Sequence, residues 1–158
     1  MVERRRVIEE TLAGAPDWWA ESARGVRGGE SLDGMLPVSR ALPACAVAEE
    51  LASEGREACD ALLEIAGQEG AGDRVFGNAV FALLYFDSLF AYRSLKVLYE
   101  GASAERRKRV DVACRKMILR CVEVPEGEQA ALRREIVRNT YGGRLATTGM
   151  VADLAVRL

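Results

Sequence analysis

One stretch of the chain, residues 75–99, limits the fold more than any other. Placed on a helix, this stretch is apolar on nearly every side along its middle part. Such a helix needs other elements packed around most of its surface. Asp87 and Arg93 interrupt the run well short of the roughly 20 apolar residues that cross a membrane, so no membrane association is expected. The pattern predicts a long apolar helix at about 74–100 in the centre of the fold.

The rest of the sequence also favours helices over strands. Alanine, leucine, glutamate and arginine are abundant, and proline occurs only four times. Apolar side chains recur at helical spacing in further stretches, most of which end at glycine or proline. These stretches are residues 2–13, a short segment after Pro16, residues 43–67 as two helices or one bent helix, 104–123, 128–141 and a last segment from about 148. We expect an all-α, compact bundle of about six to seven helices.

The length of 158 residues is that of one domain, which can bury a core without disulfides or metals. We therefore expect a single helical domain over residues 1–158. Residues 25–37 are rich in glycine and poor in apolar side chains, so this stretch is predicted to be a mobile loop.

Composition excludes several kinds of chemistry. The chain has no histidine, which removes the usual general base at neutral pH, the commonest metal ligand and every histidine-dependent triad. Its four cysteines form no CxxC pair, so we expect reduced thiols and no zinc site. The first ten residues lack the apolar segment of a secretory signal. Together these features predict a cytoplasmic protein.

The charges are sorted along the chain although the total is only −2. Residues 47–73 hold eight acids and one base, a net charge of −7. Residues 103–144 hold eleven bases and six acids, a net charge of +5. Two interpretations stay open at this stage. The two segments either pair with each other inside the fold or form two solvated faces.

Within the basic segment, Arg109, Lys116 and Arg120 fall at positions i, i+7 and i+11 of one helix. A basic stripe of this kind can follow a row of phosphates, so these residues are candidate phosphate or nucleic-acid contacts. The sequence pI near 5.4 argues against a dedicated nucleic-acid binder. No aromatic residue alternates with the stripe to stack on bases, which leaves nucleic-acid binding by a helical accessory subunit as a second alternative.

The acidic segment offers a different alternative. Carboxylates recur there at spacings that bring several of them to one helix face, and magnesium prefers oxygen ligands and needs no histidine. The candidate metal ligands are Glu50, Glu54, Glu57, Asp60 and Glu64. They would suit a magnesium-dependent hydrolase of nucleotides or phosphate esters. Outside that alternative no cofactor is expected.

Asp87 is the most unusual residue of the central apolar stretch, because it shares a helix face with large apolar side chains. A buried carboxylate without a partner is costly. We expect Asp87 either to accept hydrogen bonds that fix how helices dock, or to line a pocket and hold a cationic or hydroxylated ligand.

Apolar residues also occur where a single bundle has difficulty covering them. Val112 and Leu119 point away from the main apolar stripe of their helix, and Trp18 and Trp19 sit on a short helix beside the glycine-rich stretch. Exposed apolar patches on soluble proteins usually mark interfaces. We expect these four residues to form an interface in a homo-oligomer, most simply a dimer, that resists moderate salt.

Taken together, these features favour a non-enzymatic helical protein that acts by self-association or by binding a macromolecular partner, with a protein as the expected class. The sequence contains no nucleophile elbow, no glycine-rich phosphate loop and no compact metal motif. The magnesium-dependent hydrolase and the nucleic-acid-binding subunit are the two alternatives.

Overall fold

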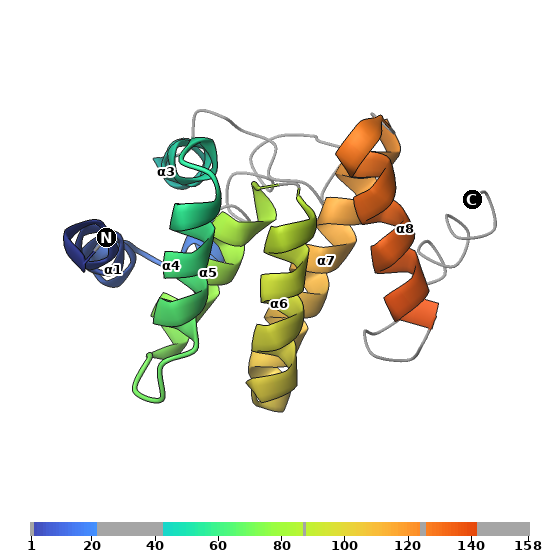
Figure 1. Cartoon of the computed structure of the whole chain (residues 1–158). Coiled ribbons are helices and arrows are strands. Elements are labelled where there is room, and N and C mark those ends of the chain that lie inside the picture. Colours follow the sequence, from blue (N-terminus) through green and yellow to red (C-terminus); the bar gives the residue numbers. More distant parts are fainter. Residues whose placement is uncertain (1, 22–42, 87, 124–125, 142–158) are drawn as a thin grey trace.

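The computed structural model of the protein describes residues 2–21, 43–86, 88–123 and 126–141 (Figure 1). The described residues form helices joined by turns and contain no strand, which confirms the predicted all-α bundle. The helices are α1 (Val2–Gly14), α3 (Pro43–Ser53), α4 (Arg56–Ala66), α5 (Asp73–Leu84), α6 (Leu89–Gly101), α7 (Ala104–Glu123) and α8 (Gly127–Tyr141), with a further helical turn at 18–21. Asp87, the predicted loop at 25–37 and the predicted last helix lie outside the described residues.

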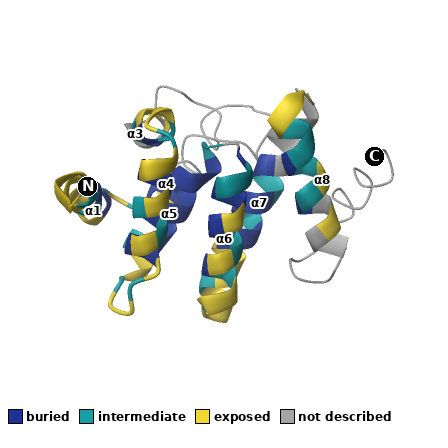
Figure 2. Cartoon of the chain, viewed as in Figure 1, coloured by how far each residue is buried: buried dark blue, intermediate teal, exposed yellow. Residues whose placement is uncertain are grey.

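Helix α5 occupies the centre of the fold. Every residue from Phe76 to Leu84 is buried, and α5 contacts α1, α3, α4, α6 and α7. In Figure 2 the buried stretch of α5 lies behind α4 in the middle of the molecule. None of the described helices is long and apolar enough to cross a membrane. The apolar stretch that dominates the sequence therefore starts with a helix enclosed by protein.

The prediction of one long helix at about 74–100 is wrong in one respect, because the stretch is divided into α5 and α6. The backbone N–H groups of Tyr85 and Phe86 donate to the carbonyls of Ala82 and Leu83, three residues back, which tightens and ends α5. Ser88 then caps α6, since its hydroxyl accepts from the backbone N–H of Ala91. The break allows the two apolar halves to pack against each other.

Other elements follow the sequence pattern closely. Gly55, with φ of 76°, separates α3 from α4 where the predicted helix over 43–67 is interrupted. On α7 the predicted inward stripe is confirmed at Val110, Cys114 and Met117, which are all buried. These features depend on residues close together in the chain, so they can be predicted from spacing alone.

A single buried amide joins the start of the chain to α5. Asn78 is completely buried, and its Nδ2 donates to the carbonyls of Leu12 at 3.3 Å and Pro16 at 3.0 Å. Its Oδ1 accepts the backbone N–H of Trp18 at 3.0 Å. The side chain therefore satisfies three backbone groups at the end of α1 and in the turn that follows. This contact determines where residues 15–21 lie on the core.

Gly77, beside Asn78 in the middle of α5, should accept a methyl group. A Cβ built there would contact Trp19 Cδ1 at 3.6 Å, an ordinary van der Waals distance. Alanine has a higher helix propensity than glycine, so Gly77→Ala should raise the free energy of unfolding by about 0.5–1 kcal/mol in urea denaturation. Gly127→Ala is the comparison, since its φ of 53° disfavours alanine and should lower stability. A loss of stability in Gly77→Ala would contradict the packing described.

Candidate binding site

The five carboxylates predicted to share a magnesium ion lie on α3, on α4 and in the turn between them. All five are exposed, and they are Glu50, Glu54, Glu57, Asp60 and Glu64. Among the described residues, no three histidine, cysteine, aspartate or glutamate side chains come close enough to hold a metal ion together. The convergence on which the hydrolase alternative depends is therefore not seen in this part of the chain.

Helix α1 supplies partners for two of these acids. The guanidinium of Arg4 pairs with both carboxylate oxygens of Glu54, with Nε donating to Oε2 at 2.8 Å. Arg5 lies 3.1 Å from Glu64. A shallow cavity of about 290 Å³ separates α1 from α4 and has these two arginines on one wall. The acidic segment is thus partly neutralised by the start of the chain, a pairing that neither sequence interpretation included.

The two tryptophans predicted at an interface are buried in the chain's own core instead. Trp18 and Trp19 expose 3% and 7% of their surface. Both rings contact Phe81, with ring centroids 5.9 Å and 5.4 Å away, and Trp19 Nε1 donates to the carbonyl of Gly77 at 2.7 Å. The expectation of an exposed pair was wrong because the turn at 18–21 folds onto α5. Of the other two predicted interface residues, Val112 packs partly buried against the core, and the side chain of Leu119 lies outside the described residues.

The basic stripe of α7 approaches the buried Trp19. The guanidinium carbon of Arg109 lies 5.7 Å from the centroid of the indole ring, and Nζ of Lys116 lies 5.4 Å from the same ring. Both distances are in the range of cation–π contacts. Two of the three predicted phosphate contacts are therefore brought together by one aromatic ring. The third, Arg120, is on α7, but its side chain is not among those described.

A surface cavity of about 340 Å³ opens beside this ring, where α5, α7 and the 17–19 turn meet. Its apolar lining comes from Trp19, Phe76 and Gly77, and Arg109 lies at its edge. We call it the Trp19 pocket. Its volume is in the range of small-molecule sites.

Two further arginines of the Trp19 pocket are held by the fold. Nε of Arg106 donates to Asp73 at 2.8 Å, and a terminal nitrogen donates to the carbonyl of Ala71 at 2.6 Å. The same guanidinium lies over the ring of Phe76, 4.9 Å from the ring centroid. Arg74 donates to the carbonyl of Ala13 at 2.6 Å. The Arg106–Asp73 pair also links the basic segment to the end of the acidic one, so the two segments meet at this pocket.

The acids of the Trp19 pocket are engaged as well. Oδ1 of Asp17 accepts the backbone N–H groups of Trp19 at 3.0 Å and Ala20 at 3.3 Å, which caps the turn at 18–21. Glu105 accepts from Lys108 at 2.9 Å. With Asp73 bound to Arg106, each carboxylate that lines the pocket already has a partner within the chain.

Comparison with known proteins does not connect this pocket to a reaction or a ligand. No protein-family model, curated protein or solved structure matches the chain.

Sequence reasoning found Arg109 and Lys116 but missed the pocket beside them. The pocket needs the 17–19 turn to reach α5 and α7, and the contact between Trp19 and Gly77 joins residues 58 positions apart. Pro16 followed by Asp17 does indicate a helix start at that turn. No local pattern indicates which distant helix the turn packs against.

Proposed function

We propose that the chain is a non-enzymatic helical protein that associates with copies of itself through its acidic α3–α4 side and the exposed arginines of α8. The observation behind this proposal is where the sorted charges lie in the fold. In Figure 1 the acidic helices α3 and α4 lie on one side of the molecule, and α8 lies on the opposite side, with α6 and α7 between them. Residues 47–73 carry −7, α7 between the two sides carries +4 over residues 104–123, and α8 carries +1 over residues 127–141.

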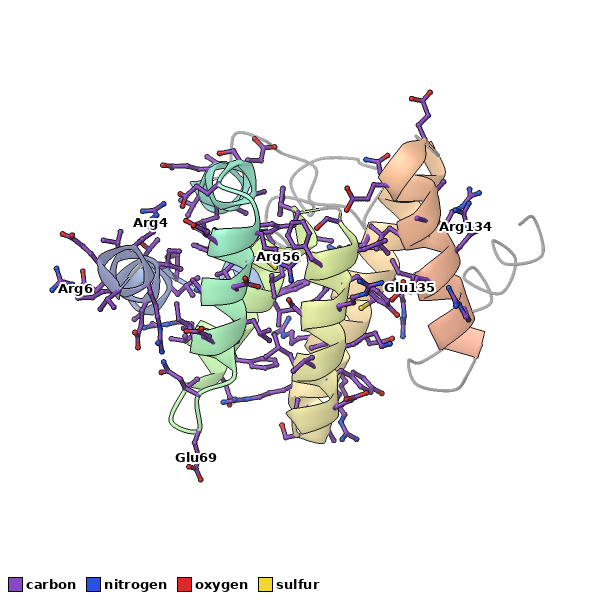
Figure 3. All side chains as sticks on the ribbon, in the orientation of Figure 1. Arg4, Arg6, Arg56, Glu69, Arg134 and Glu135 are labelled. Carbon is purple, nitrogen blue, oxygen red and sulfur yellow. The ribbon has the colours of Figure 1, made fainter. Side chains whose placement is uncertain are left out.

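Exposed charge is present on both sides. Arg134 and Arg138 on α8 are exposed, and Figure 3 shows Arg134 on the outer face of that helix. On the acidic side, Glu57 and Asp60 of α4 and Glu69 of the next turn are exposed. The exposed arginines of α8 in one copy and the acidic side of another are electrostatically complementary, which favours encounter in a defined orientation. Contacts between two different sides build open chains or rings rather than a closed twofold dimer.

Apolar association receives less support from the described surface. The exposed large hydrophobic side chains among the described residues are Val2, Val7 and Val97, two on α1 and one on α6. The tryptophans that were expected at an interface are buried. We therefore replace the expectation of a salt-resistant dimer with an association that salt weakens.

A cytoplasmic location is part of the proposal. Cys59 and Cys114 are buried free thiols, and burial raises the pKa of both above the usual cysteine value. Protonated, enclosed thiols are unreactive and fit a reducing compartment. The nucleic-acid alternative is weaker, since the ring nearest the basic stripe, Trp19, is buried and offers no stacking surface.

Sedimentation analysis tests the association. In about 10 mM salt, where exposed charges interact over about 30 Å, the mass should rise with protein concentration above the monomer value. That monomer mass is 17.2 kDa. In about 1 M salt, where the range falls to about 3 Å, the protein should return to the monomer.

Matched charge-reversal variants identify the surface. Arg134→Glu with Arg138→Glu on α8 should abolish the low-salt association. The double variant Arg6→Glu, Arg56→Glu makes the same change of charge on the acidic side. This variant should preserve or strengthen the low-salt association. A monomer under every condition refutes the proposal. An oligomer that is insensitive to salt and to the α8 variant refutes it too and would indicate an apolar interface.

A further inference from the structure

The Trp19 pocket has a feature that self-association does not use: a guanidinium held at its edge over an aromatic ring. Arg109 is exposed, and its guanidinium contacts the indole of Trp19 at 5.7 Å. Among the described residues it forms no ion pair with a carboxylate. The other two arginines of the pocket are bound to Asp73, to Ala71 and to Ala13. Arg109 therefore keeps donors that are available to a ligand.

The position of this guanidinium is defined by the fold. Trp19 exposes only 7% of its surface, and its Nε1 donates to the carbonyl of Gly77. The ring is therefore a fixed surface for the cation above it. Cation–π contact orients a guanidinium flat on the ring and leaves its N–H groups pointing outward in the plane. An arginine that is already ordered loses less conformational freedom when it binds an anion.

The remaining lining indicates what else a ligand would meet. Trp19, Phe76 and Gly77 supply apolar surface, and Asp73, with 91% of its side chain exposed, presents a carboxylate at the edge. A carboxylate with unused lone pairs can accept from hydroxyl or amino groups. The pocket of about 340 Å³ is thus lined by three arginines, by three carboxylates that have partners within the chain, and by an apolar wall; of the arginines, Arg109 is the one whose guanidinium forms no ion pair or hydrogen bond with the described residues.

We propose that the Trp19 pocket binds a small molecule that carries an oxyanion group, phosphate or carboxylate, together with hydroxyl or amino donors. The oxyanion pairs with the guanidinium of Arg109 through two parallel hydrogen bonds. The donors of the ligand face Asp73, and its carbon skeleton lies against the apolar wall.

Tryptophan fluorescence and calorimetry test this binding directly, because the chain contains only two tryptophans and one of them, Trp19, lines the pocket. Inorganic phosphate, glycerol 3-phosphate and glutamate serve as probes, with sodium chloride at matched ionic strength as the blank. We expect saturable binding of at least one probe, with a dissociation constant no weaker than about 1 mM. Tighter binding of glycerol 3-phosphate than of phosphate would show that the hydroxyl donors contribute to affinity. Tighter binding of glutamate than of both phosphates would indicate a carboxylate ligand.

Variants with the same change of net charge distinguish binding at this pocket from general electrostatic attraction of anions to the protein. Arg109→Gln should weaken binding at least tenfold, the loss expected for a hydrogen bond to a charged group of about 1.5 kcal/mol. Arg109→Lys should weaken it less, because the charge remains while the bidentate geometry is lost. Arg93→Gln, on α6 and outside the pocket lining, should bind as the parent does.

Two outcomes overturn the proposal: no saturable response to any probe, or equal binding by the Arg109→Gln and parent proteins. Far-UV circular dichroism checks that each variant is folded. If the Arg109→Gln protein does not fold, the Arg109→Lys protein still tests the site. Repeating the titration at low salt with the Arg134→Glu, Arg138→Glu protein, which should not associate, makes the result independent of the proposed association.

Discussion

Replacing Phe81 with alanine should lower the free energy of unfolding by about 3–5 kcal/mol, the loss usual for a fully buried aromatic side chain. Phe81 is completely buried and its ring contacts three others, those of Trp18, Trp19 and Tyr85, at centroid distances of 5.9, 5.4 and 5.5 Å. Alanine would leave a cavity that these rings cannot fill without moving. Urea denaturation followed by circular dichroism measures the loss.

A half-buried phenylalanine provides the control. Phe90 contacts Phe86 at the edge of the core with a centroid distance of 6.3 Å, so Phe90→Ala should cost less than half as much. Tryptophan fluorescence adds a second readout. Phe81→Ala removes a ring that contacts both indoles and should change the emission, whereas Phe90→Ala removes a ring that contacts neither indole. Equal losses in the two variants would show that the aromatic cluster at Phe81 is not the centre of the core.

The substitution Asn78→Leu should reduce the free energy of unfolding by about 2–4 kcal/mol, although leucine has nearly the same size as asparagine. The amide satisfies the carbonyls of Leu12 and Pro16 and the backbone N–H of Trp18. Leucine can satisfy none of them, and each buried backbone group left without a partner is costly. The loss should therefore exceed any gain from the added apolar surface.

Local release of the first helix distinguishes this mechanism from general destabilisation. In Asn78→Leu, acrylamide should quench the two tryptophans at urea concentrations below the main unfolding transition, since residues 15–21 would detach first. Thr11→Ala is the comparison: its exposed hydroxyl bonds only within α1, to the carbonyl of Val7, and the change should stay within about 0.5 kcal/mol. A stable Asn78→Leu protein with protected tryptophans would refute the role assigned to the amide.

Asn78 shows a limit of sequence reasoning in the central stretch. The pattern selected Asp87 as a residue that fixes how helices dock or holds a ligand, and this stays a prediction because Asp87 lies outside the described residues. The structure gives a docking role to Asn78, whose partners are 60 to 66 positions away. Nothing near Asn78 in the sequence indicates those partners.

The charges give the same lesson. Their sorting along the chain is evident from the sequence, and so is the placement of Arg109 and Lys116 on one stripe. The pairing of Glu54 with Arg4, 50 positions away, is not evident. A guanidinium can reach any exposed carboxylate of suitable geometry, so the choice among many depends on how the helices dock.

The sequence alone determined the helices of this protein and the inward face of α7, because caps, breaks and apolar periodicity act between residues a few positions apart. The division at Ser88 is local too, and a serine cap there could have been read from the sequence. Only the tertiary structure decided that both tryptophans are buried, that α1 neutralises part of the acidic face, and that Arg109 meets Trp19 at a pocket. Each of these depends on contacts between distant segments, whose geometry is set by how the whole core packs.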